Sequence, residues 1–238
     1  MPGRLGRLAA EGAVVISHAP PRAHWAARIL LAMTSLAAPV MLFLLTIAFA
    51  WDLRGVPLTL LDGVLSPPGR PDLYPSTWLS VGHAVLPLVF LLANLVNRRY
   101  GEDFAIAFVL AAWAAAALAA IGMMYRYLPD ILVPREAPSL RVAASFFACL
   151  VVGQVLGVFV FDRTRGVVWW KAPLYSALAS AFAASFLFYP IAFAGGDAAW
   201  LNHMSIDAGV KAAMSFALLL PYLALRPLVR PLGGFGGF

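Results

Sequence analysis

Six stretches of mainly apolar residues, each about 20 residues long, occupy most of this 238-residue chain. A helix needs about that length to cross the hydrocarbon core of a membrane. The stretches cover approximately residues 29–50, 77–97, 104–127, 141–161, 172–194 and 204–225. Hydrophobic residues make up 62% of the chain, well above the roughly one half found in soluble domains. The sequence therefore predicts an all-α polytopic membrane protein, a bundle of six transmembrane helices.

The connections between the stretches are short, apart from residues 52–76, so we expect one transmembrane domain over residues 29–226. Residues 1–28 are expected to form a cytoplasmic N-terminal segment. They lack the short apolar core and cleavage site of a signal peptide, so we expect no cleaved leader. Residues 227–238 are rich in glycine and are expected to form a flexible cytoplasmic tail.

The basic residues are distributed unevenly over the two sides that six spans define. If the N-terminus is cytoplasmic, eleven Lys and Arg residues lie in the inside segments, five lie in the outside segments, and Lys211 lies within a span. An excess of basic residues on the cytoplasmic side is typical of membrane proteins. The distribution of the basic residues thus indicates the orientation of the protein in the membrane, and the net charge of +6 is not interpreted as a sign of a nucleic-acid partner. Both termini are predicted to be cytoplasmic, and the location is predicted to be the inner (plasma) membrane of a bacterium.

Motifs of soluble enzymes are absent from the sequence. It contains no GxxxxGK[ST] phosphate loop, no HExxH and no Cys/His cluster with ligand spacing. Cys149 is the single cysteine, and His83 lies far in sequence from the other histidines. We therefore expect no enzyme activity, no catalytic residues, no metal site and no cofactor.

Polar side chains within the apolar stretches are the candidate substrate-binding residues, because such groups are costly in hydrocarbon and tend to face a helix bundle or a cavity. The sequence contains Asn94, Asn97, Gln154, Ser180, Asp207 and Lys211 in such positions. Two aromatic residues beside them, Phe186 and Tyr189, could stack on a ring or could face lipid.

Each polar candidate has a second interpretation. Lys211, with Asp207 one helical turn before it, could face a cavity or could be a lysine that reaches toward the membrane surface. Gln154 could bind a ligand or could link helices. Asn94 and Asn97 lie on one helix face and could instead cap a helix end.

Small residues recur at helical spacing in the third and fifth stretches, which predicts that these two helices lie at the centre of the bundle. Gly153 and Gly157 form a GxxxG pattern in the fourth stretch. That pattern is compatible with a tight helix crossing, and with a homodimer, without establishing either.

The segment PLVFLLANLVNRRYG at residues 87–101 resembles the signature of the putative vitamin uptake transporter family, which includes the queuosine precursor transporters. The resemblance continues in order through RVAASFFACLVVGQVLGVFVFDRTR, WWKAPLYSALASAFAASFLFYPIAF and SIDAGVKAAMSFALLLPYLAL. It covers about residues 77–225. Six spans in the predicted orientation are also what this resemblance implies.

The resemblance implies that Asn97, Gln154 and Lys211 match polar positions of the family. The chain departs from the family where aspartates are usual, because it has Asn94, Gly157 and Ala184 there. It also has Arg98 in place of a glutamate and Ala181 in place of an amide residue.

We expect a secondary transporter or facilitator for a small polar or heterocyclic metabolite; the resemblance implies a 7-deazaguanine precursor of queuosine. The expected partners are this small molecule and the lipid bilayer. One alternative is the substrate-binding membrane subunit of an energy-coupling factor type transporter, which would require partner ATPase subunits. Another is a relative that binds or assembles without transporting.

The predicted topology can be tested with reporter fusions. Because of the eleven-to-five distribution of basic residues, tags on both termini should report the cytoplasm and a tag in residues 52–76 should report the outside. A periplasmic N-terminus would contradict the predicted orientation.

Overall fold

The computed structural model describes residues 25–65, 74–122, 139–196 and 199–232. The chain divides into two compact units, residues 1–38 and 39–238. Of the first unit, only the beginning of helix α2 is described, and the second unit holds all the other described helices. Most of the predicted N-terminal segment and the last six residues of the predicted tail lie outside the described residues.

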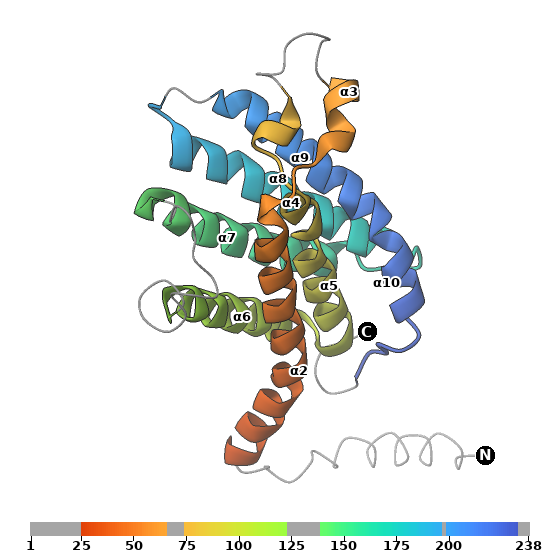
Figure 1. The fold of residues 1–238 in the computed structure, drawn as a ribbon. Coiled ribbons are helices and arrows are strands. Elements are labelled where there is room, and N and C mark those ends of the chain that lie inside the picture. Colours follow the sequence, from red (N-terminus) through yellow and green to blue (C-terminus); the bar gives the residue numbers. More distant parts are fainter. Residues whose placement is uncertain (1–24, 66–73, 123–138, 197–198, 233–238) are drawn as a thin grey trace, which may run out of the picture. The chain divides into compact units, whose positions relative to one another are not determined.

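The described residues form helices, with one isolated antiparallel bridge between Pro57 and Ser80 (Figure 1). The long helices are α2 (Trp25–Asp52), α6 (Glu102–Gly122), α7 (Leu140–Thr164), α8 (Lys171–Phe193) and α9 (Trp200–Ala217). Shorter ones are α4 (Val81–Val85), α5 (Leu88–Tyr100) and α10 (Leu219–Leu225), and between α2 and α4 lie η1 (Leu53–Gly55), η2 (Thr59–Leu61), α3 (Asp62–Leu65) and η4 (Pro75–Thr77). Six helical segments of the described chain are long and apolar enough to cross a membrane, which confirms the predicted all-α fold with six spans.

Two of the six spans consist of two helices each. The second span breaks between α4 and α5, where Pro87 precedes the first residue of α5, and the sixth span breaks at Leu218, between α9 and α10. Proline lacks the N–H group that would continue the helix and its ring disturbs the preceding turn. In contrast, Pro39 and Pro190 lie inside continuous helices. A proline within an apolar stretch of this chain therefore does not by itself predict whether the helix is interrupted.

Helix α8 is the centre of the second unit. It packs extensively against α7 and α9, and it also contacts α5 and α10, as Figure 1 shows for its neighbours in the bundle. The prediction that the fifth span is central is thus confirmed. The same prediction for the third span is wrong, because α6 buries only one face, which includes Phe108, Ala112 and Trp113. This face contacts α5, α7 and Phe43 of α2. Alanine-rich composition alone does not distinguish a helix packed on two sides from a helix packed on one.

Helices α7 and α8 cross closely at the glycines of the GxxxG pattern. A Cβ atom added to Gly153 would lie 2.7 Å from the backbone oxygen of Ser180, and one added to Gly157 would lie 2.0 Å from the Ser180 hydroxyl oxygen. A side chain at Gly153 would require the backbone of α8 to move, whereas one at Gly157 would first require the Ser180 hydroxyl to rotate away. The crossing is therefore within one chain, and small residues permit it.

The C-terminal end of α8 is stabilised by an arginine from α7. The guanidinium group of Arg141 donates hydrogen bonds to the backbone oxygens of Ile191 at 2.6 Å and Ala194 at 3.1 Å. Carbonyl groups at a helix end have no partner within the helix, and a cation there also interacts favourably with the helix dipole. This contact holds the two antiparallel helices in register at one end.

The tight crossing predicts a specific loss of stability. Gly153→Ala should lower the free energy of unfolding by about 1 to 3 kcal/mol, because a methyl group must displace the backbone of α8. Gly209→Ala is the matched control, since nothing lies within 4 Å of a Cβ atom at that position on α9, and alanine is favoured over glycine in a helix. Thermal unfolding of both variants in detergent measures the difference. Equal stability of the two variants would contradict the crossing.

Candidate functional site

A buried ion pair lies within the sixth span. The ammonium nitrogen of Lys211 lies 2.5 Å from Oδ2 of Asp207, one turn earlier on α9. Ser185 of α8 joins the pair, because its hydroxyl donates to the same oxygen at 2.8 Å and accepts from the ammonium at 3.1 Å. All three residues are buried, with 1%, 5% and 0% exposure for Asp207, Lys211 and Ser185. Lys211 therefore does not reach the membrane surface, and we call these three residues the ion-pair centre.

The ion-pair centre retains unused hydrogen-bonding capacity. The second carboxylate oxygen of Asp207, Oδ1, is buried and has no hydrogen-bond donor among the described residues. An ammonium group has three N–H donors, and the contacts to Asp207 and Ser185 use two of them. A buried carboxylate oxygen without a partner is unfavourable. A ligand with an N–H group beside a carbonyl oxygen would satisfy both open positions.

Two further side chains lie in the electrostatic surroundings of Asp207. His83 of α4 and Tyr189 of α8 both interact with its charge. The backbone N–H group of Ser80 donates to Nδ1 of His83 at 3.2 Å, so the neutral imidazole carries its proton on Nε2. No cluster of three metal-ligating side chains occurs in the part of the chain that the structure describes.

Both polar atoms of the Gln154 side chain form hydrogen bonds to neighbouring helices. Its amide nitrogen donates to the backbone oxygen of Val89 on α5 at 2.9 Å. Its amide oxygen accepts a short hydrogen bond from the indole N–H group of Trp113 on α6. With an exposure of 1%, Gln154 links α5, α6 and α7. Of the two interpretations left open by the sequence, the contacts favour the interhelical link.

Asn94 connects α5 to α8. Its amide nitrogen donates to the backbone oxygen of Pro173 at 3.0 Å, and its amide oxygen accepts from the hydroxyl of Ser176 at 2.6 Å. A cavity of about 10 Å³ lies beside it, lined also by Ser215 and Tyr222. A space of that size holds about one water molecule. Asn94 thus lies at a helix contact and not at a helix cap.

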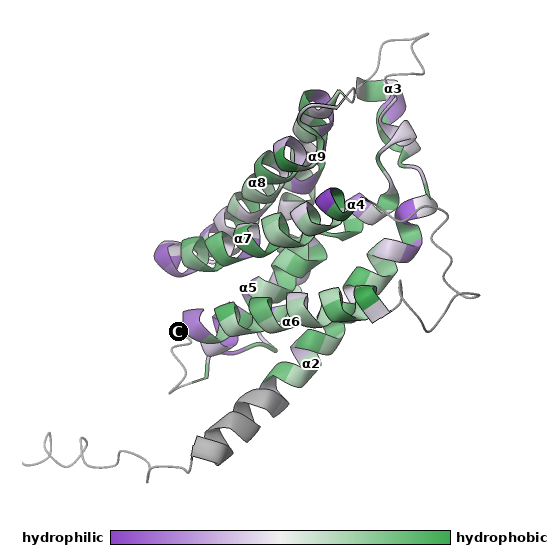
Figure 2. Cartoon of the chain, turned by 90° about the vertical axis from the view of Figure 1, so that its left-hand side faces the viewer, coloured by the Kyte–Doolittle hydropathy of each residue, from purple (hydrophilic) through white to green (hydrophobic). Residues whose placement is uncertain are grey.

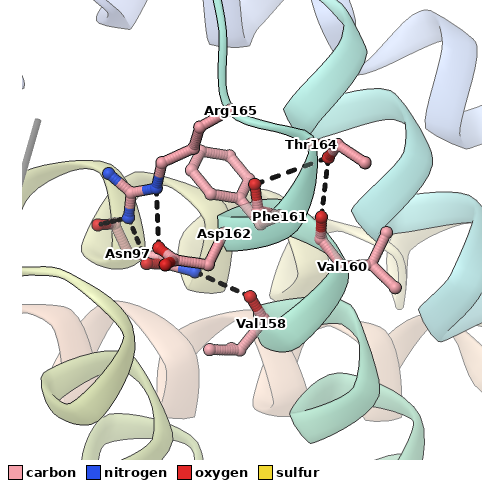
Figure 3. A network of polar contacts seen from close by, with 7 residues as sticks. All are labelled: Asn97, Val158, Val160, Phe161, Asp162, Thr164 and Arg165. Carbon is pink, nitrogen blue, oxygen red and sulfur yellow. Dashed lines mark hydrogen bonds and ion pairs between the residues drawn. The ribbon is translucent and has the colours of Figure 1, made fainter.

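Asn97 belongs to a second polar network at the end of α5, shown in Figure 3. Its amide nitrogen donates to the backbone oxygen of Val158 on α7 at 3.1 Å. Arg165 follows α7 and donates to the side-chain oxygen of Asn97 at 2.6 Å and to its backbone oxygen at 2.8 Å. Arg165 also pairs with Asp162 at 2.7 Å. The guanidinium group therefore caps the C-terminal end of α5.

The other predicted site residues are divided between two environments. Ser180 is buried in the crossing of α7 and α8 beside Gly157. Phe186 is 49% exposed and stacks on Phe182 of the same helix. Of the two aromatic candidates, Tyr189 is buried near Asp207 and Phe186 lies on the outer face.

The structure brings together Asp207, Lys211 and Tyr189 of the predicted set, and it places Asn94, Asn97, Gln154 and Ser180 at contacts between helices. Sequence reasoning missed Ser185 and His83 as neighbours of the ion pair. Both residues are polar groups within apolar stretches, which is the one signal that could have included them. Spacing within one helix cannot show which residues of another helix they meet.

Comparisons with known proteins find similarity to transporters. A family model described as "Putative vitamin uptake transporter" matches residues 80–225. The "Probable queuosine precursor transporter" of Haemophilus influenzae is 34% identical over 125 residues, which are 50% of this chain and 52% of that protein. The matched region thus spans about half the length of this relative. No solved structure matches the chain.

The role of Gln154 can be tested directly. Gln154→Leu should lower the free energy of unfolding by about 1 to 3 kcal/mol, because it leaves the Trp113 N–H group without a partner and removes the hydrogen bond that links Gln154 to the Val89 oxygen. Trp113→Phe and the double variant complete a cycle that measures the coupling. If Gln154 only links helices, the folded variants should bind a transported ligand with the same affinity as the wild type. A loss of affinity without a loss of stability would identify Gln154 as a ligand-binding residue.

Proposed function

Since this chain belongs to the putative vitamin uptake transporter family, we propose that it is a membrane transporter for a nitrogen-rich heterocycle of the queuosine-precursor type. The family model covers more than half of the chain, and six apolar helices make it a multi-pass membrane protein. We place it in the inner membrane of a bacterium, with both termini in the cytoplasm. Its activity is translocation, without chemistry on the substrate.

The observation that carries this proposal is the ion-pair centre. Asp207 offers an acceptor through Oδ1, and Lys211 offers one remaining donor from the same buried position. The lactam edge of a 7-deazaguanine presents a ring N–H group beside a carbonyl oxygen, which is the complementary pattern. Charge-assisted hydrogen bonds of this kind are stronger than neutral ones. Tyr189 provides an aromatic side chain in the electrostatic surroundings of Asp207.

The broken spans support the same location. Helix α9, which carries Asp207 and Lys211, contacts α4. The second span is interrupted where α4 ends, and the sixth span is interrupted where α9 ends. In many transporters, substrate sites are formed by discontinuous helices, whose ends present backbone groups to the substrate. The ion-pair centre is formed by α8 and by α9, which is such an interrupted helix.

Two positions at which aspartates are usual in the family lie at a helix contact in this chain. Gly157 and Ala184 both lie in the crossing of α7 and α8, and the Cβ atom of Ala184 would be 3.2 Å from a Cβ atom on Gly153. An aspartate at residue 184 would be forced into this contact. We propose that Asp207 of α9 supplies the acceptor for the substrate instead.

Uptake by the purified protein in liposomes tests the function. We expect saturable accumulation of a labelled 7-deazaguanine, and competition by unlabelled compound, with no added ATPase subunit. Uptake that appears only with an ATP-hydrolysing partner would contradict a self-sufficient transporter. Absence of both binding and uptake for this class of ligand would contradict the proposed substrate.

The ion-pair centre predicts different results for single and double variants. Lys211→Met should lower the free energy of unfolding by about 3 to 5 kcal/mol, because it leaves the Asp207 carboxylate buried and unpaired. Asp207→Asn combined with Lys211→Met removes both charges, so it should recover most of that stability. Neither variant should bind or transport the substrate.

Lys171→Met is the matched control, because Lys171 is exposed at the start of α8. It should retain stability and uptake. Thermal unfolding and uptake are measured for all variants in the same lipid. A folded double variant with unchanged uptake would show that the ion-pair centre only stabilises the bundle.

A further inference from the structure

A second cavity lies at the other end of the bundle, where α5, α7 and α10 end and α8 begins. Its volume is about 70 Å³. Three arginines contribute to its lining, together with aromatic side chains. They are Arg98, Arg165 and Arg226, with Phe161, Trp169 and Tyr222. We call this the arginine pocket, and it shares no residue with the ion-pair centre.

The charges in the arginine pocket are only partly compensated. No acidic side chain lines it. Arg165 pairs with Asp162 at 2.7 Å, whereas Arg98 uses its Nε atom to donate to the backbone oxygen of Val229 at 3.1 Å. Arg226 has no carboxylate partner within the described residues. Of the three guanidinium groups, only that of Arg165 forms an ion pair with a carboxylate of the described residues. The Tyr222 hydroxyl lies within electrostatic range of all three arginines.

This end of the bundle is basic as a whole. The described residues there include seven basic side chains, Arg98, Arg99, Arg163, Arg165, Lys171, Arg226 and Arg230, and three acidic ones, Glu102, Asp103 and Asp162. Figure 2 shows hydrophilic residues gathered where α7 ends and where α6 begins. The same end is predicted to be cytoplasmic, and the cytoplasmic leaflet carries the anionic lipids.

The loop between α7 and α8 presents apolar and aromatic side chains beside the arginine pocket. Val167 is fully exposed, and Trp170 is 36% exposed. Trp169, which is half-buried, lines the pocket. An exposed tryptophan and an apolar loop tip beside arginines are unfavourable in water but favourable at the membrane interface, where an indole ring has both apolar and polar neighbours. These side chains therefore favour a position of the arginine pocket near the lipid headgroups.

We propose that the arginine pocket binds the phosphate group of an anionic phospholipid from the adjacent leaflet. Guanidinium groups match phosphate oxygens through paired N–H donors. Basic pockets between helices at a membrane surface are suited to anionic headgroups. The Trp169 ring lies beside the glycerol region of the bound lipid. The lipid holds the ends of α5, α7 and α10 together, because each of these ends contributes or adjoins one of the three arginines.

The test compares variants of the full-length protein in nanodiscs of phosphatidylcholine alone and of phosphatidylcholine with phosphatidylglycerol. Arg226→Gln removes the guanidinium group that has no carboxylate partner. Arg230→Gln is the matched control, because it removes the same charge from an exposed position at the same end that does not line the pocket. The Tm in each nanodisc and the phosphatidylglycerol retained in native mass spectrometry are measured. Inorganic phosphate is added to the phosphatidylcholine nanodiscs as a separate arm.

Phosphatidylglycerol should raise the Tm of the wild type and of Arg230→Gln. Phosphatidylglycerol should bind to Arg226→Gln with an affinity about tenfold lower than to the wild type, as expected for the loss of a charge-assisted hydrogen bond. Equal Tm values in phosphatidylcholine would show that Arg226→Gln is folded. If Arg226→Gln and Arg230→Gln lost equal amounts of phosphatidylglycerol affinity, the proposal would be overturned, because the lipid would then be attracted by the basic surface as a whole and not by the pocket. Stabilisation by inorganic phosphate that Arg226→Gln abolishes would also overturn it, because the pocket would then bind a soluble anion.

Discussion

The close crossing of α7 and α8 is the contact on which the other features of the bundle depend. In a membrane, helices gain little from burying apolar side chains, because lipid tails are equally apolar, so association depends on packing and on interhelical hydrogen bonds. Gly153 and Gly157 allow the backbone of α8 to approach α7 so closely that a single methyl group would collide with it. This approach fixes α8, which in turn contacts α5, α9 and α10. The position of Ser185 against α9, and of Ser176 against α5, follows from it.

Polar groups then specify how the remaining helices attach to this pair. Gln154 joins α7 to α5 and α6, and Asn94 joins α5 to α8. Each of these links satisfies a polar side chain that would otherwise be unpaired in hydrocarbon. They occupy donors and acceptors that a substrate would need. The ion-pair centre differs from them, because Asp207 keeps one buried oxygen without a donor in the described chain.

The two candidate sites have different physical characters. The ion-pair centre lies within the bundle, has nearly zero exposure and offers one acceptor and one donor, which suits a neutral heterocycle. The arginine pocket lies at a bundle end, is cationic and adjoins an apolar loop, which suits an anionic headgroup. The cation on Lys211 is balanced by Asp207 at 2.5 Å, whereas only Arg165 of the three arginines pairs with a carboxylate of the described residues, that of Asp162. The distribution of compensating carboxylates thus separates a site for a polar substrate from a site for phosphate.

The sequence alone determined that the chain is helical, that it has six spans, and where most of these spans lie, because the length and apolarity needed to cross a bilayer are properties of local sequence. It also predicted the pairing of Asp207 with Lys211, since residues four apart lie on one helix face. Only the tertiary structure decided that Gln154 and Asn94 are engaged between helices, that Phe186 faces outward, and that α6 lies off the centre. Only the structure added Ser185 to the ion pair and brought Arg98, Arg165 and Arg226 together. These contacts join helices that are distant in sequence, and the rotation of each helix about its axis is set by packing against its neighbours.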